Sequence, residues 1–429
     1  MVALCEPALV PPADSPTPVA ELGARAKAAS RVVAVASTAQ KDDALLAAAD
    51  RLESHVDAVL AANAADVEEA TRAGTAAGQV DRLRLTPARI EAMAGGLRQV
   101  AALPDPVGTV TDGWTRPNGL RIQRVRVPLG VVAIIYESRP NVTSDAFGIC
   151  LKSGNVAFLR GSSAALHSNV AVAEALHEGV AKAGLPQDCL VVVTDTSHET
   201  ATELMKLRDH IDCLIPRGGR ALIASILENA TVPYVIDGDG NCHVYVDASA
   251  DLEMARDIVV NAKVSRPSVC NAAESLVVHA DVARDFVPTV AEVLHRAGVE
   301  LIGDSRSASL SGLIGRAAAE DFSAEFLDLK MSVAVVDTLS EAIAHVNTHG
   351  SGHSEAIVTR DLAAAERFCT EVDAAATLVN ASTRFVDGEE FGFGAEIGIS
   401  TQKLHARGPM GLEQLTTLKF VVHGDGQVR

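Results

Sequence analysis

The sequence predicts an α/β protein with two tandem α/β domains and parallel-rich sheets, and three observations support this prediction. Apolar residues make up 48% of the 429-residue chain, but aromatic residues make up only 3%. Cores built from small and β-branched side chains suit helices packed on a largely parallel sheet. Short apolar runs alternate with helical patterns in two successive series, which indicates repeated β-α-β units. The length also exceeds what a single core ordinarily serves.

The N-terminal region is predicted to be helical after a loose tail. Residues 1–20 are proline-rich and lack the basic stretch and apolar core of a signal peptide, so we interpret them as a flexible tail. From 21 to 74, apolar residues return every three or four positions, which predicts helix. A further helix is predicted from Thr86 and Pro87 to Gln99, with the threonine as N-cap.

The first series of strands begins after this helical region. Apolar and polar residues alternate over 120–127, which predicts a strand with one exposed face, available for pairing with another subunit. Residues 131–135 are apolar throughout, as in a strand buried on both faces. Further strands are predicted at 156–159, 190–194, 213–216 and 232–236, with helices at 163–183, 198–207 and 220–229.

A second series predicts the other α/β domain. Its strands are expected at 243–247, 276–278, 333–336, 355–359 and 377–379, and its helices at 252–262, 282–297 and 361–372. The stretch 236–241 is interpreted as the hinge between the two domains, with Asp237 and Asp239 as turn residues.

Charge and cysteine usage exclude several classes of function. The formal net charge of -18 argues against nucleic acid or an anionic membrane as partner, although local cations can still bind a small anion. The sequence contains no run of about 18 uncharged apolar residues, so it predicts no membrane-spanning helix. The seven cysteines are scattered, which suggests neither a disulfide framework nor a metal site and favours a reducing, cytoplasmic location.

Cys270 is the strongest candidate for a reactive group. It closes a loop of small residues that carries Lys263 and Arg266, and an apolar strand-like run follows. Nearby cations lower a thiol's pKa and favour the nucleophilic thiolate. Packing is the ordinary role of a free cysteine, but the loop context favours reactivity here.

The glycine motifs do not predict a common nucleotide-binding loop. Gly238-Asp-Gly240 and Gly392-Phe-Gly394 both lack the third glycine and the strand-to-helix context of a dinucleotide fingerprint. A nucleotide would therefore have to bind in another mode.

Several longer blocks together resemble the γ-glutamyl phosphate reductases, a family of the aldehyde dehydrogenase superfamily, from about residue 21 to the C-terminus. The blocks are Val127-Pro-Leu-Gly-Val131, Tyr136-Glu-Ser-Arg-Pro-Asn-Val-Thr143, Lys152-Ser-Gly-Asn-Val156, Leu159-Arg-Gly161, Ile215-Pro-Arg-Gly-Gly219, Asn241-Cys-His-Val-Tyr-Val-Asp247, the Cys270 loop, Val379-Asn-Ala-Ser-Thr-Arg-Phe385 and Ser400-Thr-Gln-Lys-Leu-His-Ala-Arg-Gly-Pro-Met-Gly411.

The resemblance implies an aldehyde dehydrogenase-like fold with a small β oligomerisation flap. The expected parts are an NADP-binding domain (21–118 and 129–240), a catalytic domain (241–399), and the flap with the C-terminal segment (119–128 and 400–429). The implied reaction is the NADPH-dependent reduction of L-glutamate 5-phosphate to the semialdehyde in proline biosynthesis. A homo-oligomer and a contact with the glutamate 5-kinase are the implied protein partners.

In this reaction Cys270 would attack the acyl phosphate and hold the acyl group as a thioester. An oxyanion needs hydrogen-bond donors, and Asn141 is the candidate amide, although a turn-forming role beside Pro140 is about equally compatible. Ordinary aldehyde dehydrogenases carry a glutamate near the hinge that activates water. Residues 235–241 lack a glutamate, which favours transfer of the acyl group to hydride.

The resemblance also implies sites for the cofactor and the substrate. Arg160 suits a 2′-phosphate by bidentate pairing, which favours NADPH over NADH. The sequence Gly161-Ser162-Ser163 departs from the Gly-Gly-Lys expected in this family. The other cofactor candidates are Pro216, Arg217, Gly218, Gly219 and Glu325, and the cations expected for the substrate are Arg266, Arg384, Lys403, His405 and Arg407.

Two alternatives stay open at this point. The first is oxidation of another aldehyde with NAD or NADP, against which the absent hinge glutamate speaks. The second is a catalytically silent partner of the glutamate kinase, against which the intact Cys270 loop speaks.

Overall fold

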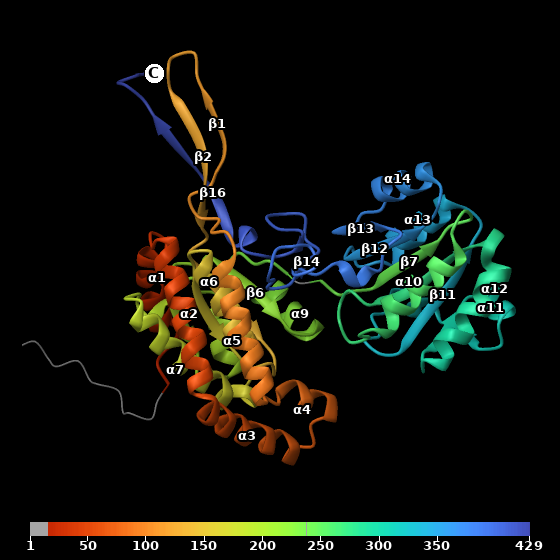
Figure 1. Ribbon diagram of the computed structural model, residues 1–429, viewed down its shortest axis with the longest axis horizontal. Helices are drawn as coiled ribbons and strands as arrows, with labels where there is room; N and C mark the ends of the chain where they lie inside the picture. Colours follow the sequence, from red (N-terminus) through yellow and green to blue (C-terminus); the bar gives the residue numbers. More distant parts are fainter. Residues whose placement is uncertain (1–15, 237) are drawn as a thin grey trace, which may run out of the picture. The chain divides into compact units, whose positions relative to one another are not determined.

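The computed structural model describes residues 16–236 and 238–429, and the chain forms two compact units (Figure 1). The first unit comprises the chain up to Ala102, Val127–Leu214 and Ala221–Tyr234. The second comprises Leu103–Arg126, Ile215–Arg220 and Val235–Arg429. The predicted tail falls almost entirely outside the described residues, and helix already begins at Val19.

The helical start of the first unit consists of five separate helices where the sequence predicted fewer. These are α1 (Val19–Val33), α2 (Thr38–Ser54), α3 (Val56–Arg72), α4 (Ala77–Leu83) and α5 (Pro87–Ala102). Ser37 accepts a hydrogen bond from the Gln40 amide and begins α2 with a capping box. The predicted start of α5 is confirmed, because Thr86 Oγ1 accepts from the Arg89 amide at 3.2 Å.

A four-stranded sheet with the order β5-β4-β3-β6 forms the centre of the first unit. Its strands are β3 (Val131–Tyr136), β4 (Val156–Arg160), β5 (Leu190–Val192) and β6 (Cys213–Arg217), and the connecting helices are α6 (Asn141–Lys152), α7 (Leu166–Lys182), α8 (His198–Leu204) and α9 (Arg220–Asn229). The predicted burial of β3 is confirmed, since all six of its residues are buried.

The strand predicted at 232–236 is wrong. Only an isolated bridge between Leu214 and Tyr234 is present there, beside a hydrogen bond from the Leu214 amide to the Pro233 carbonyl. Pro233 has no N–H group and cannot donate to a ladder, which limits pairing at this point.

The second unit contains a seven-stranded sheet with the order β10-β9-β11-β8-β7-β12-β13. Every neighbouring pair is parallel. The strands are β7 (Cys242–Val246), β8 (Ala273–His279), β9 (Glu300–Gly303), β10 (Ile314–Arg316), β11 (Lys330–Val336), β12 (Ser354–Val358) and β13 (Ala376–Val379). The helices are α10 (Leu252–Val264), α11 (Ala280–Arg296), α12 (Ser305–Leu310), α13 (Leu339–His349) and α14 (Leu362–Glu371).

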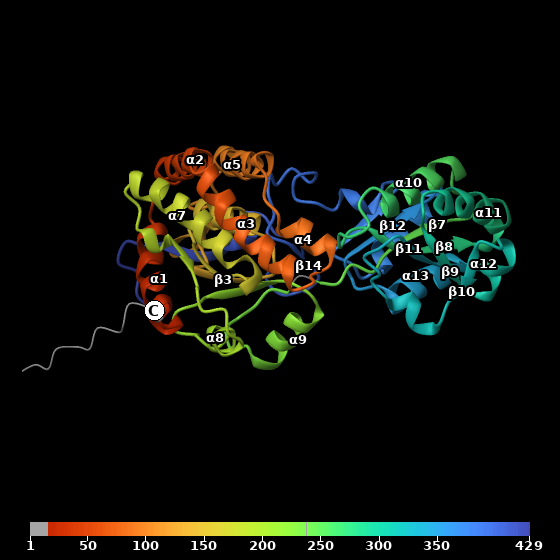
Figure 2. The same ribbon diagram turned by 90° about the horizontal axis from the view of Figure 1, so that it is seen from below.

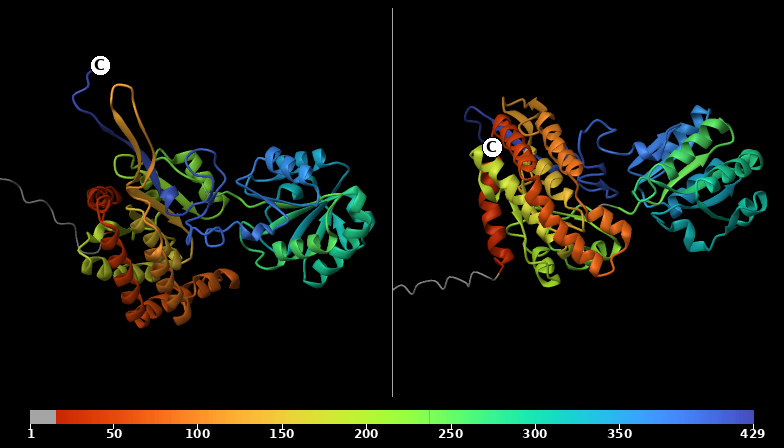
Figure 3. Two further views of the ribbon diagram at one scale, coloured as in Figure 1. Left: turned by 45° about the horizontal axis from the view of Figure 1, so that its top comes forward. Right: turned by 60° about the horizontal axis from the view of Figure 1, so that its bottom comes forward.

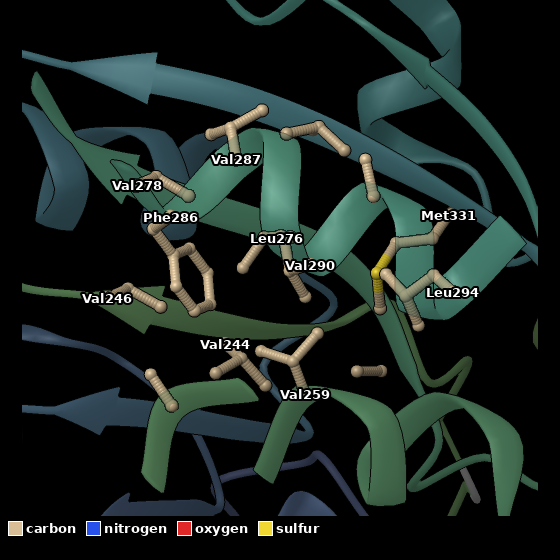
Figure 4. Close-up of a cluster of buried hydrophobic side chains, with 14 of the residues drawn as sticks. Val244, Val246, Val259, Leu276, Val278, Phe286, Val287, Val290, Leu294 and Met331 are labelled. Carbon is tan, nitrogen blue, oxygen red and sulfur yellow. The ribbon is translucent and has the colours of Figure 1, made fainter. Parts of the chain in front are cut away.

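Alternate side chains of the central strands enter two different cores. Val244, Val246, Leu276 and Val278 pack with α10 and α11, as Figure 4 shows. Tyr245, Val277 and Ile357 pack with α13 and α14 on the opposite face. Figure 2 shows α10 and α13 on opposite sides of this sheet. Burial on both faces explains why residues 244–246 and 276–278 are apolar at consecutive positions.

A separate three-stranded sheet has the order β1-β2-β16. It joins β1 (Val110–Thr115) and β2 (Arg121–Pro128), which are antiparallel, to β16 (Thr416–His423) near the C-terminus (Figure 3). The predicted exposed strand at 120–127 is confirmed, and β16 pairs with it in the same sheet. A short two-stranded sheet pairs β14 (Ile399–Ser400) with β15 (Gly408–Pro409). No helix of the described residues is long and apolar enough to cross a membrane.

Candidate active site

Cys270 lies in the loop that connects helix α10 to strand β8 of the central sheet. Its side chain is half-buried, whereas Cys150, Cys189, Cys213 and Cys242 are buried. Burial raises the pKa of the Cys242 thiol well above its usual range. A reactive thiol needs both access and a scaffold, and the Cys270 loop provides the two together.

Gly240 and Cys242 fix the backbone of Cys270 from the side of β7. A Cβ atom on Gly240 would lie 1.7 Å from the Cys270 carbonyl oxygen, so only glycine allows this approach. The Cys242 thiol donates a hydrogen bond to the same oxygen at 3.2 Å. Gly240 of the 238–240 motif therefore serves close packing against the Cys270 loop, whereas Gly238 packs against the side chain of Thr401.

The loop that follows β13 holds Cys270 from the other side through its neighbour Asn271. Thr383 Oγ1 donates to the Asn271 carbonyl at 2.7 Å, and Asn271 Nδ2 donates to the Val386 carbonyl at 2.9 Å. The guanidinium of Arg384 donates to Asn271 Oδ1 and, through Nε, to Ser265 Oγ at 3.3 Å. These contacts place Arg384, one of the cations expected for the substrate, against the Cys270 loop.

Arg384 also interacts electrostatically with Arg266 and with Cys270. Burial and the like charge of Arg266 lower the pKa of Arg384, and the negative charges of Asp387 and Cys270 oppose this lowering. Arg384 therefore lies within electrostatic range of both Arg266 and Cys270, and positive charge near a thiol favours the thiolate.

The positive charge of Lys263 is paired with the carboxylate of Glu274. Its ammonium is fully buried and lies 2.6 Å from Glu274 Oε2, which is also fully buried. Burial lowers the pKa of Lys263, and burial raises the pKa of Glu274 to about 7, while the attraction between the two opposes both changes. The expectation that Lys263 supplies positive charge to the Cys270 sulfur is corrected, because Glu274 compensates that charge.

Glu325 accepts a hydrogen bond from the Gly240 amide at 2.7 Å. Its carboxylate therefore lies beside the glycine that packs on Cys270, which is compatible with the predicted role at the nicotinamide ribose. Asn241 next to it donates to the carbonyls of Phe322 and His349, both at 2.8 Å. Asp237 of the predicted hinge lies outside the described residues.

The remaining three candidate cations gather around Asp373 and Gln414. Lys403 Nζ lies 2.6 Å and Arg407 Nη2 2.8 Å from the Asp373 carboxylate, whose pKa they lower. His405 bonds through Nε2 to the Gln414 carbonyl at 2.7 Å and has a φ of 67°. These contacts place them at a surface cluster and leave Arg266 and Arg384 as the cations at the Cys270 loop.

In the first unit, Arg160 ends strand β4 and is held by backbone groups. It donates through Nη2 to the carbonyls of Thr196 and Ser197. Its buried Nε has no hydrogen-bond partner among the described residues. Burial lowers the pKa of Arg160, and the charge of Asp195 opposes this lowering. A buried donor at the carboxyl end of a parallel strand suits an anionic ligand.

The residues after Arg160 form a tight turn into α7. A Cβ atom on Gly161 would lie 2.2 Å from Asn169 Nδ2, so a side chain does not fit. Ser162 Oγ lies 3.1 Å from Ser138 Oγ, and Ser163 begins a single 3₁₀ turn, Ser163–Ala165, before α7.

Pro216, Arg217, Gly218 and Gly219 end strand β6 and precede α9. This is the strand-to-helix position expected for backbone groups that approach a cofactor.

Asn141 is the first residue of helix α6, where the sequence left open a turn. Its Nδ2 donates to Asp145 Oδ2 at 2.8 Å. Asn141 belongs to the first unit and Cys270 to the second.

Gly240, Asn271 and Glu274 are parts of the site that were not predicted from the sequence. Asn271 and Glu274 follow Cys270 within four positions, so attention to polar residues entering a buried strand would have found them.

Known proteins fit this architecture. The model of the aldehyde dehydrogenase family matches residues 8–323 and 331–421. A gamma-glutamyl phosphate reductase of Clostridium beijerinckii is 54% identical over 407 residues, which cover 95% of this chain and 98% of the relative. The corresponding protein of Syntrophomonas wolfei is 53% identical over 409 residues, with the same coverage.

Solved structures agree with these relatives. The crystal structure of gamma-glutamyl phosphate reductase from Thermotoga maritima has a TM-score of 0.95 and 45% identity, and the match covers 96% of this chain and 100% of that one. An acetylating aldehyde dehydrogenase from Geobacillus thermoglucosidasius, 18% identical, shares the fold with a TM-score of 0.66, over 96% of this chain and 97% of that one.

The chain belongs to the aldehyde dehydrogenase family and, within it, to the gamma-glutamyl phosphate reductases. Membership of this family implies a nicotinamide cofactor, and the predicted aldehyde dehydrogenase-like fold is confirmed.

Proposed function

We propose that this protein reduces L-glutamate 5-phosphate to L-glutamate 5-semialdehyde and phosphate with NADPH, the second step of proline biosynthesis. The observation that carries the proposal is the half-buried Cys270 thiol in a loop bound by Arg384. The names of the most similar relatives support the same substrate.

The chemistry begins with the Cys270 thiolate, which attacks the acyl carbon and expels phosphate. The acyl group then forms a thioester with Cys270, so that one difficult step becomes two easier ones. Arg266 and Arg384 stabilise the thiolate and the departing phosphate by their charge. Asn141 is the proposed amide donor to the oxyanion, together with the Cys270 backbone amide.

When bound, the cofactor would supply the hydride that reduction of the Cys270 thioester to the aldehyde requires. The residues proposed to hold it are Arg160, Gly161, Ser162, Ser163, Pro216, Arg217, Gly218, Gly219 and Glu325. The unpartnered Nε of Arg160 among the described residues supports an anionic group there. Because a guanidinium pairs with a 2′-phosphate, we propose NADPH in preference to NADH.

Lys403, His405 and Arg407 are proposed to act at the outer part of the substrate site. Their contacts with Asp373 and Gln414 mean that substrate would compete with these partners. We therefore assign the acyl phosphate to Arg266 and Arg384 and the substrate carboxylate to the second group.

The β1-β2-β16 sheet is proposed as the surface that forms a homo-oligomer. Leu418, Phe420 and Val422 are exposed at alternate positions of the edge strand β16, and the Phe420 ring meets Trp114 at 6.2 Å. Exposed apolar edges favour pairing with a second strand. We also propose a contact with glutamate 5-kinase. The scattered thiols support the proposal of a cytoplasmic location.

The reverse reaction tests the proposed function most directly. Glutamate semialdehyde and NADP⁺ should form NADPH only when inorganic phosphate is present, and NAD⁺ should be the poorer acceptor. Cys270→Ala should abolish the reaction. Formation of NADPH without phosphate would indicate aldehyde oxidation by water and would contradict the proposal.

A further inference from the structure

The segment 322–327 lies between the two sides of the Cys270 site and is bound to both. At one end, Asn241 Nδ2 donates to the Phe322 carbonyl at 2.8 Å. In the middle, Glu325 accepts from the Gly240 amide at 2.7 Å. At the other end, the Leu327 amide donates to Glu274 Oε1 at 3.1 Å. Glu274 is thus the partner of this segment on the side of strand β8.

Glu274 has a second partner at the base of the Cys270 loop. Lys263 is in the last turn of α10 and Glu274 is the second residue of β8, so their 2.6 Å ion pair joins the two ends of the loop. Both side chains are fully buried. A buried pair of this kind contributes little net stability over an apolar pair, and its best-supported use is to specify one arrangement.

These contacts connect the segment 322–327 to the Cys270 loop at two points. Glu274 binds Lys263 and Leu327, Glu325 lies two residues before Leu327 and binds Gly240, and the Gly240 backbone packs against the carbonyl of Cys270. Leu327 has a φ of 54°, an unusual conformation for leucine that surrounding contacts must hold in place. The Leu327–Glu274 hydrogen bond is one such contact.

We propose that Glu274 is a positioning residue that couples the Cys270 loop to the segment carrying Glu325. Glu274 Oε2 binds Lys263 and so fixes the base of the Cys270 loop. Glu274 Oε1 accepts from the Leu327 amide and so fixes the segment that carries Glu325, whose carboxylate binds the Gly240 amide. Displacement of either segment then displaces the other. The part that concerns the cofactor rests on the proposed role of Glu325, whereas the part that concerns Cys270 does not.

Two double variants separate this coupling from the ion pair itself. In Lys263→Met with Glu274→Gln, the buried charges are gone but the side-chain oxygen that accepts from Leu327 is retained. In Lys263→Met with Glu274→Leu, the acceptor is also lost at similar volume. Both variants have the same charge, and they differ in whether residue 274 offers an acceptor to the Leu327 amide. A single Glu274 substitution is unsuitable because it leaves Lys263 buried without its partner.

The readouts are NADPH affinity by fluorescence titration and the rate of Cys270 alkylation by iodoacetamide across pH. Both variants lose the link through Lys263, so both should depart from the native protein in the two readouts. The Leu variant, which also loses the acceptor for the Leu327 amide, should lose about tenfold more than the Gln variant, the value of one hydrogen bond. Thermal unfolding, measured alongside, shows that each variant is folded at the assay temperature. Equal affinity and equal alkylation profiles in the two variants would overturn the proposal.

Hydrogen exchange of the native protein provides a test that needs no variant. This test remains available if the Leu variant does not fold. In the native protein, addition of NADP⁺ should slow hydrogen exchange at the Gly240 amide and at the Leu327 amide together. Slowing of one amide without the other contradicts the coupling. Glu325→Gln tests the underlying assignment separately: unchanged NADPH affinity refutes the cofactor role of Glu325, and the alkylation profiles of the double variants still decide whether Glu274 positions the Cys270 loop.

Discussion

Gly240→Ala is the substitution for which the structure predicts the largest effect from the smallest change. The added methyl group would lie 1.7 Å from the Cys270 carbonyl oxygen, 2.4 Å from its carbonyl carbon and 2.6 Å from its Cα. Ordinary contact begins at 3.4 Å, so the two backbones must separate by about 1.7 Å, the difference between 3.4 and 1.7. All three atoms belong to backbone, and no side-chain rotation can relieve the overlap.

The expected consequence is a misplaced nucleophile. A displacement of about 1 Å at a reacting group costs about 100-fold in rate, so kcat should fall by at least about that factor. Overpacking should also destabilise the fold by about 1–3 kcal/mol. Steady-state kinetics, Cys270 alkylation and urea unfolding measure these effects.

Gly95→Ala is the matched control, because Gly95 lies within helix α5 and an added Cβ meets no atom within 4 Å. This change should leave kcat unaltered and stabilise the helix by about 0.5–1 kcal/mol. If Gly240→Ala retained native kcat and alkylation rate, the inferred close packing on Cys270 would be refuted.

Three further predictions concern other contacts. Arg384→Ala should slow alkylation of Cys270 at pH 7 by about tenfold, since loss of a nearby cation raises the thiol's pKa; an unchanged pH profile would contradict this. Lys152→Met should cost about 1–3 kcal/mol in urea unfolding, because the buried Lys152 donates to the Ala101 carbonyl and pairs with the partly exposed Asp42; Lys152→Met with Asp42→Asn should recover part of it. Burial lowers the pKa of His353 to about 4. The unfolded chain therefore binds more protons than the folded one between about pH 6.5 and 4, and stability should fall over that window as pH decreases, by on the order of 3 kcal/mol. A His353→Gln variant with the same acid dependence as the native protein would show that another group is responsible.

The sequence predicted the elements whose pattern is set by burial. Strand β3 is apolar throughout because it is buried on both faces, and the exposed strand β2 alternates because one face is solvated. Strands β9 and β10 were missed, since Gly303 follows only two apolar residues in β9 and Gly315 interrupts β10, so neither has a continuous strand pattern.

The site was predictable only as far as sequence proximity reflects contact. Cys270 and Arg266 share one loop, and Arg384 was recognised by the block that contains it. The partner of Lys263 was not predictable, because helix direction and strand register bring Glu274 to it across eleven positions. Gly240 was interpreted as an element of a weak nucleotide motif, since a glycine's near neighbours are known only from the fold.

The sheet that contains β16 has a consequence for synthesis of the chain. Strand β2 ends at Pro128 and its partner β16 begins at Thr416. A nascent chain therefore exposes β1 and β2 on the ribosome long before β16 has been made. Until then the edge of β2 that pairs with β16 is free, and chaperones must protect it from pairing with other chains.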